Sequence, residues 1–176
     1  LQQPAEIVAL IGPGIGSVRV VTLWEADGPQ VLYGVWRHPA PGTWVDAAIH
    51  GNPNVGCSLD ADGRVMTALR GDLLYGTEIT HSLIAPDLPL VGARLDQWPE
   101  MVAICREAHR TFPGHALIGW DMAMTLRGPV ISEANANPLH MSYQRAFRRG
   151  FLHYDHRERL DVARRRGSGD RCGGPF

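Results

Sequence analysis

Two carboxylates and an amide in the second half of the chain have the spacing of an oxygen-ligand set. Asp121 lies in an alternating apolar run, Ala116 to Thr125, and Glu133 and Asn135 lie at the end of a second run that begins at Pro129. Glu133 and Asn135 are two residues apart, so in a strand they share one face of a sheet. Oxygen donors without Cys or His suit Mg²⁺ or Mn²⁺ rather than zinc. The alternative is that Asp121 and Glu133 form a surface pair beside a turn.

The elements that position this set are a hairpin and a helix. A short segment with glycine, Leu126 to Gly128, joins the two runs and predicts an antiparallel hairpin. Before the hairpin, Asp96 to Phe112 has apolar residues at helical spacing, with Pro99 in the expected first turn and Gly114 beyond the end. We expect the apolar stripe of this helix to pack on the sheet that carries the ligand set.

Two arginines stand among apolar residues in an earlier predicted hairpin. Arg19 lies in the run Val18 to Glu25 and Arg37 ends the run Gln30 to Arg37, with a turn of Ala26 to Pro29 between them. A half-buried arginine needs a partner, and the planar guanidinium suits a polyphosphate. A protein carboxylate is the equally open alternative for each.

These residues resemble the catalytic end of the ATP-grasp superfamily, in which an Asp on one strand and Glu-x-Asn on the next bind the magnesium ions that bridge the nucleotide phosphates. The matching positions are Asp121, Glu133 and Asn135, followed by Pro138. Gly119-Trp120-Asp121-Met122-Ala123 and Gly128-Pro129-Val130-Ile131 resemble the sugar-transfer-associated branch. Arg19-Val20-Val21-Thr22 resembles an Arg-Val-Val-Thr strand of the family, and Arg37 resembles the arginine that closes the following strand.

The resemblance implies an α+β fold, namely the C-terminal lobe of an ATP-grasp enzyme with a mostly antiparallel sheet and packed helices. It runs from about Leu1 to about Ala146, so we expect residues 1–152 to form this metal-binding lobe. Residues 153–176 are basic and then glycine-rich, and we expect them to be a disordered tail. The lobe with the phosphate-binding lysines is expected to come from preceding sequence or a partner chain, and the fragment alone is expected to be inactive.

The resemblance also implies roles. ATP and Mg²⁺ or Mn²⁺ are the expected cofactors, with Asp121, Glu133 and Asn135 as metal ligands and Glu133 shared by both ions. Gln2 or the adjacent Gln3, Arg19, Arg37 and Asn135 would contact the nucleotide, the two arginines acting in catalysis. A small carboxylate would attack the γ-phosphate to give an acylphosphate, which an amine or another nucleophile then takes, as in a carbon-nitrogen ligase.

One segment departs from the family. Trp44 to Gly63 is rich in turn residues and is expected to be mostly loop. Here Ala47 follows Asp46 where the family has an Asn, and Gly51-Asn52 stands where it has a Gly-Gly pair. The departure leaves a second hypothesis open, a non-catalytic nucleotide- or metal-binding or scaffolding remnant of the ATP-grasp fold.

Composition bounds the remaining classes. The chain has 176 residues, is 44% hydrophobic and has a net charge of −1, so it fits one core and does not suggest a nucleic-acid or membrane partner. It lacks a run of about 18 apolar residues or a signal-peptide pattern, and we expect a cytoplasmic protein. Three cysteines and eight scattered histidines favour neither disulfides nor zinc. His153 and His156 around Asp155 are expected to form a solvated face.

Overall fold

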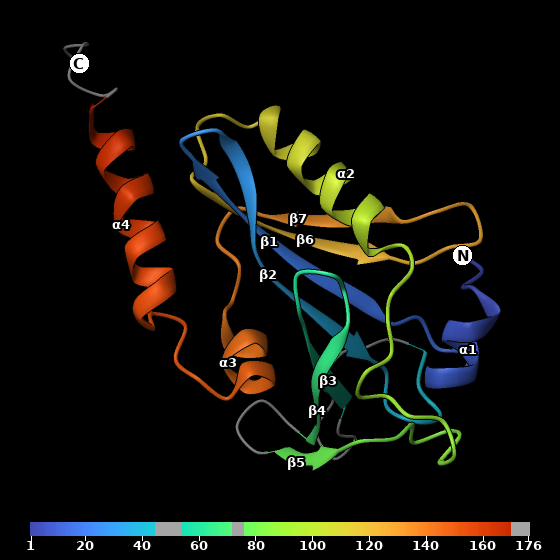
Figure 1. Ribbon diagram of the computed structural model, residues 1–176. Helices are drawn as coiled ribbons and strands as arrows, with labels where there is room; N and C mark the ends of the chain where they lie inside the picture. The colour runs from blue at the N-terminus through green and yellow to red at the C-terminus, as the bar shows by residue number, and fades with distance from the viewer. Residues whose placement is uncertain (45–53, 72–75, 170–176) are drawn as a thin grey trace.

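A seven-stranded antiparallel sheet forms the centre of the computed structural model, with helices on both faces (Figure 1). The structure describes residues 1–44, 54–71 and 76–169, the last five as backbone only. The strands lie in the order β5-β4-β3-β2-β1-β6-β7. Their bounds and those of the helices are α1 Ala5–Ile11, β1 Ser17–Glu25, β2 Gly28–His38, β3 Asn54–Leu59, β4 Val65–Gly71, β5 Gly76–Ile79, α2 Trp98–Arg110, β6 Leu117–Ala123, β7 Val130–Asn135, α3 Met141–Phe147 and α4 Tyr154–Gly169. The α+β class and the mostly antiparallel sheet predicted from the sequence are confirmed.

One face of the sheet is covered by α2. The helix presents Trp98, Met101 and Cys105, all buried, to a cluster that includes Val18 and Val20 of β1. Pro99 lies in the first turn and basic residues lie in the last, as the sequence predicts. The helix thereby packs against one face of the central strands β1 and β6.

The opposite face of β1 carries both apolar and polar side chains. Val21 and Leu23, toward the end of the strand, pack with Tyr143 of α3 and Ala163 of α4. Arg19 is nearer the start of β1 and belongs to the same face, because successive side chains of a strand alternate between faces. The helices α3 and α4 therefore leave a polar region beside an apolar one on this face.

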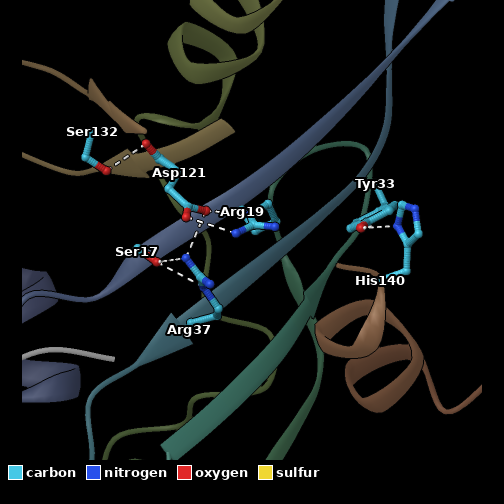
Figure 2. A network of polar contacts seen from close by, with 7 residues as sticks. All are labelled: Ser17, Arg19, Tyr33, Arg37, Asp121, Ser132 and His140. Carbon is cyan, nitrogen blue, oxygen red and sulfur yellow. Dashed lines mark hydrogen bonds and ion pairs between the residues drawn. The ribbon is translucent and has the colours of Figure 1, made fainter. Parts of the chain in front are cut away.

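A β-bulge sets the pairing of β6 with β7, the hairpin predicted around Leu126 to Gly128. The register of β6 and β7 shifts next to Asp121, which pairs with Glu133, while Met122 pairs with Ile131. Ser132, the extra residue, donates its hydroxyl to the carbonyl of Asp121 over 2.9 Å (Figure 2). The bulge keeps Glu133 opposite Asp121 although the hairpin shifts register beyond it.

The expectation that Trp44 to Gly63 is mostly loop was wrong for its second half. β3 is buried along its whole length and pairs with β2 and β4. A strand buried on both faces shows no polar alternation, so the turn residues around it dominate the sequence pattern. Arg145 of α3 stabilises the start of β3 by donating to Oδ1 of Asn54 over 2.7 Å.

The expectation of a disordered tail from residue 153 was also wrong, because α4 occupies Tyr154–Gly169. Ala163 is buried and Leu160 packs against the same cluster as Val21. Arg159 pairs with Glu25 of β1 at 2.5 Å. This helix is polar on average and depends on tertiary contacts that a composition argument does not detect. Residues 170–176 lie outside the described part of the chain.

Shorter elements lie before and after the sheet. The first helix begins after Pro4, and the segment from Gly12 to Gly16 is a turn region in which Gly12 has a φ of 81°. After the hairpin, α3 ends at Phe147, where Arg148 adopts a left-handed conformation. Within the described residues, none of the helices has the length and apolar character needed to cross a membrane.

Candidate functional site

Asp121 lies between the two arginines that the sequence singles out (Figure 2). Arg19 donates from Nε to Oδ1 of Asp121 over 2.5 Å and from Nη2 to Oδ2 over 2.9 Å. Nη2 of Arg37 lies 2.9 Å from Oδ1 of Asp121 and also donates to the Ser17 hydroxyl over 2.6 Å. The side chains of Arg19 and Asp121 are each 10% exposed and that of Arg37 is 22% exposed. The three residues form a largely buried ionic cluster, which we call the Arg19–Asp121–Arg37 cluster.

The register of three neighbouring strands brings this cluster together. Arg19 of β1 is paired with Asp121 of β6, and Ser17 of β1 is paired with Arg37 of β2. Residues directly opposite each other in an antiparallel pair leave the sheet on the same face. The strand pattern explains the shared face, whereas the pairing of distant segments sets the contacts.

The cluster holds its charges in their ionised forms. Burial works to raise the pKa of Asp121, but the hydrogen bonds and positive charges of Arg19 and Arg37 outweigh it and keep that pKa below its ordinary value. Burial works to lower the pKa of Arg19, and Asp121 more than compensates, with a smaller contribution from the negative charge of Glu133. Glu133 is therefore close enough to act on the cluster.

Glu133 and Asn135 lie on the same face as Asp121. Glu133 pairs with Asp121, and Asn135 pairs with Gly119, two residues earlier on β6. Glu133 is exposed and Asn135 is half-buried. The Nδ2 atom of Asn135 is buried and has no hydrogen-bond partner among the described residues. The structure thus brings together the predicted ligands and the two predicted arginines, while the ligand roles themselves stay predictions.

The donor set fits a hard cation in its chemistry. Two carboxylates and an amide oxygen are ligands that Mg²⁺ accepts. The unpartnered Nδ2 of Asn135 is an N–H donor, so it calls for an acceptor such as a phosphate oxygen and does not itself ligate a cation. A carboxylate has about four lone-pair positions, of which three on Asp121 accept from the arginines. In the described residues, no group of three or more His, Cys, Asp or Glu side chains is arranged to hold a metal. Any metal here would need the amide and a further ligand from water or substrate.

Sequence reasoning missed a second polar contact beside the cluster. The hydroxyl of Tyr33 lies 2.9 Å from Nδ1 of His140 (Figure 2), and the His140 ring stacks on Phe151 at 3.4 Å between centroids. Burial and the nearby charge of Arg19 lower the pKa of His140 to about 4. His140 lies five residues after Asn135 of the Glu-x-Asn segment, and that position was the available signal. A neutral imidazole next to Arg19 connects the site to α3.

The remaining predicted site residues are placed elsewhere or differently. Gln2 is exposed, and its carbonyl accepts from the backbone of Leu126 in the β6–β7 loop. Gln3 is buried and bonds Gly14 and Gly16, so its side chain holds a turn. Asp46, Ala47, Gly51 and Asn52, which carry the departure from the family, lie outside the described residues.

The expected solvated face at His153 and His156 was wrong. His156 is 5% exposed and donates from Nδ1 to the carbonyl of Phe151 over 3.1 Å. Its ring centroid lies 4.8 Å from that of Tyr143. Burial, followed by the charge of His153, lowers the pKa of His156 to about 4. These two histidines are part of an aromatic cluster that anchors α4.

The comparisons with known proteins gave one match. Residues 1–157 match the family model described as sugar-transfer associated ATP-grasp, which covers nearly the whole chain and ends within α4. Neither the curated proteins nor the solved structures include a match to the chain.

Proposed function

The chain belongs to the sugar-transfer associated ATP-grasp family, and from that premise we propose that it supplies the metal- and phosphate-binding lobe of an ATP- and Mg²⁺-dependent carboxylate ligase. The family implies an ATP-binding fold. The observation that carries the finer proposal is the Arg19–Asp121–Arg37 cluster with Glu133 beside it on the same face. The N-terminal lobe of such a site would come from other sequence or from a partner chain.

The charges of the site support this proposal. Arg19 and Arg37 balance Asp121 and Glu133, so the four side chains sum to zero. A triphosphate carries about four negative charges, and two divalent ions carry four positive ones, so the nucleotide with its metals would enter without changing that balance. A triphosphate alone would meet two carboxylates as well as two arginines, and we expect it to bind poorly.

Each side chain has a distinct role in the proposed reaction. Arg19 and Arg37 would turn from Asp121 to the phosphate oxygens, because a guanidinium fits phosphate as well as carboxylate. Asp121, Glu133 and the amide oxygen of Asn135 would then hold the divalent ions, with Glu133 bridging them. Bound Mg²⁺ would neutralise charge on the transferring phosphoryl group and fix the line of attack.

The proposed chemistry balances without another reagent. A substrate carboxylate oxygen bonds to the γ-phosphorus while the bond from that phosphorus to the β,γ-bridging oxygen breaks, and ADP leaves. An amine or another nucleophile then bonds to the acyl carbon of the acylphosphate while the carbon–oxygen bond to phosphate breaks, so that inorganic phosphate leaves and the nucleophile gives up a proton. Neutral His140 and Tyr33 border the cluster, and we assign them to positioning Arg19 rather than to proton transfer.

A non-catalytic remnant of the fold is the second candidate. The observation that favours it is that both oxygens of Asp121 already accept from guanidinium groups, which makes a closed structural cluster. In that case the cluster would stabilise the sheet, and metal with nucleotide would bind weakly or not at all.

Thermal unfolding with Mg²⁺ and ATP tests the proposal. At about 100 times the dissociation constant, a ligand stabilises the folded state by about 2.7 kcal/mol, which raises the Tm of a chain of this size by roughly 5–11 °C. Glu133→Ala should abolish this rise, while Glu158→Ala, at an exposed position of α4, should leave it intact. A rise that is equal in both variants, or that ATP gives in the presence of a chelator, contradicts the proposal.

ADP release separates the two candidates. The protein joined to its N-terminal lobe should convert ATP to ADP when a suitable carboxylate is added, and Arg37→Gln should reduce that rate strongly. Binding of Mg²⁺ and ATP without ADP release across a carboxylate panel would favour the non-catalytic remnant.

A further inference from the structure

A cavity lies at the edge of β2 where β3 no longer accompanies it. β3 pairs only with Gly34 to His38, so the first half of β2 has β1 as its neighbour on one side and, among the described strands, no neighbour on the other. The cavity there has a volume of about 400 Å³, within the range of small-molecule pockets. Its walls come from β2, the end of β3, α2, the segment from α3 to Arg149, and α4. None of the residues of the Arg19–Asp121–Arg37 cluster lines this cavity. Tyr33, which contacts His140 beside that cluster, also lines the cavity.

Positive charge is in excess along this cavity. Arg106 of α2 donates from Nε to the carbonyl of Pro29 over 2.9 Å, and Arg149 donates from Nε to the Tyr143 hydroxyl over 2.7 Å. Among the described residues, neither guanidinium has a carboxylate within ion-pair distance. The third lining arginine, Arg159, pairs with Glu25 at 2.5 Å. Two guanidinium groups thus face the cavity with neutral partners only.

The one carboxylate in the cavity wall is already engaged. Oδ1 of Asp60 accepts from the backbone N–H groups of Asp62 at 2.9 Å and Arg64 at 2.8 Å in the β3–β4 turn. His156 also lines the cavity, and burial keeps its pKa near 4, so it adds no charge at neutral pH. The lining therefore has a net positive charge, because it contains three arginines and one carboxylate, and the hydrogen bonds of Asp60 direct that carboxylate to the β3–β4 turn.

The other walls are flat and apolar. The rings of Tyr143 and Phe147 stack at 4.5 Å between centroids, and the guanidinium carbon of Arg149 lies 5.5 Å from the Phe147 centroid. Trp98 and Val102 of α2 line the opposite side. The indole N–H of Trp98 donates to the carbonyl of Ala61 over 2.9 Å, which fixes the ring. A planar apolar group would lie between preformed surfaces.

We propose that this cavity binds a small amphipathic anion, namely a carboxylate or phosphate carried on a flat apolar body. The anionic end contacts Arg106 and Arg149, whose free N–H groups suit either oxyanion. The apolar body lies against Phe147 and Val102, which are half-buried, and the buried rings of Tyr143 and Trp98 complete the walls. This binding does not depend on the proposed ligase function, because none of the residues assigned to metal or ATP takes part.

Titration calorimetry with benzoate and phenyl phosphate tests the proposal, with benzyl alcohol and inorganic phosphate as the matched fragments. At least one of the two aromatic anions should bind, and each matched fragment should bind at least about tenfold more weakly. Benzyl alcohol lacks hydrogen bonds between charged groups, which contribute about 1.5–3 kcal/mol each, and inorganic phosphate lacks the ring that the apolar walls bury. Comparison of benzoate with phenyl phosphate identifies the preferred head group. Benzyl alcohol as strong as the anions, inorganic phosphate as strong as phenyl phosphate, or no binding of either anion would overturn the proposal.

Variants locate the site. The double variant Arg106→Gln, Arg149→Gln should raise the Kd at least about tenfold, and Arg149→Gln alone, at an exposed residue, tests the same contact if the double variant unfolds. Arg94→Gln, another exposed arginine outside the cavity, should leave the Kd unchanged. In NMR spectra the Trp98 indole resonance should shift on titration of the wild type. Glu133→Gln, which alters the proposed metal site, should bind the aromatic anion with the wild-type Kd. An unshifted Trp98 signal, or a Kd in Arg149→Gln equal to that of the wild type, would contradict the location of the site.

Discussion

Asp121→Asn is the substitution whose outcome follows most directly from the site geometry. It keeps the size of the side chain and removes the charge that Arg19 and Arg37 share. Losing one partner of a buried ion pair costs about 3–5 kcal/mol, and the partial exposure of Arg37, at 22%, places the expected loss near about 3 kcal/mol. For a domain of this size that loss corresponds to a fall in Tm of roughly 6–12 °C.

The same substitution should improve metal-free binding of a polyphosphate. With Asp121 neutral, the two guanidinium groups have no carboxylate between them, so an added anion can take its place. Inorganic tripolyphosphate with a chelator should therefore raise the Tm of Asp121→Asn clearly and that of the wild type little. Mg²⁺ should add nothing further in the variant, since one ligand has lost its charge.

Thermal unfolding followed by circular dichroism, with and without tripolyphosphate, measures both effects. Glu78→Gln is the control, because Glu78 and Arg148 form an ion pair whose side chains are 59% and 61% exposed, and such surface pairs contribute about 0–1 kcal/mol. The reasoning is refuted if Asp121→Asn loses no more stability than Glu78→Gln. It is also refuted if tripolyphosphate stabilises the wild type as much as the variant.

Further predictions concern pH and packing. Burial lowers the pKa values of His38 to about 3 and of His140 and His156 to about 4. Between about pH 6.5 and 4 the unfolded chain therefore binds more protons than the folded one. Urea unfolding should show that the free energy of unfolding decreases as the pH is lowered through that window, by up to about 1.4 kcal/mol per pH unit for each histidine. Asp121, with its depressed pKa, adds a further loss of stability only as the pH falls below about 4, the ordinary pKa range of a carboxyl. His156→Phe should make stability less dependent on pH above that point. An unchanged pH dependence in this variant would contradict the role given to His156. Gly119→Ala places a Cβ 2.6 Å from Cβ of Pro138, so it should displace the segment after Asn135 and weaken stabilisation by Mg²⁺ and ATP. Gly114→Ala, whose added Cβ meets nothing within 4 Å, should not weaken it. Equal ligand-induced shifts in the Tm of the two variants would show that the packing of Gly119 against Pro138 does not position the site.

The strands and the main helix could be predicted because their sequence signals are local. The period-2 runs on both sides of Leu126 to Gly128 became β6 and β7, and the apolar stripe of Asp96 to Phe112 became the buried side of α2. The shared face of Glu133 and Asn135 also followed from strand geometry, although the bulge at Ser132 was not visible in the pattern. These features depend on neighbouring residues only.

The features that could not be predicted depend on distant residues. β3 has no polar alternation because both of its faces are buried, and the polar helix α4 is ordered by contacts such as Arg159 with Glu25, 134 residues apart. The sequence left open whether Arg19 would meet a phosphate or a protein carboxylate. The structure places it on Asp121, the residue expected to hold the metal, and only the pairing of β1 with β6 could reveal that.

Anomalous scattering from crystals grown with Mn²⁺ and a non-hydrolysable ATP analogue tests the central claim most directly. The account predicts a manganese peak bounded by the side chains of Asp121, Glu133 and Asn135, with Arg19 and Arg37 turned to the phosphates. An intact fork between Arg19 and Asp121, with manganese bound away from Glu133 in the same crystals, would contradict it.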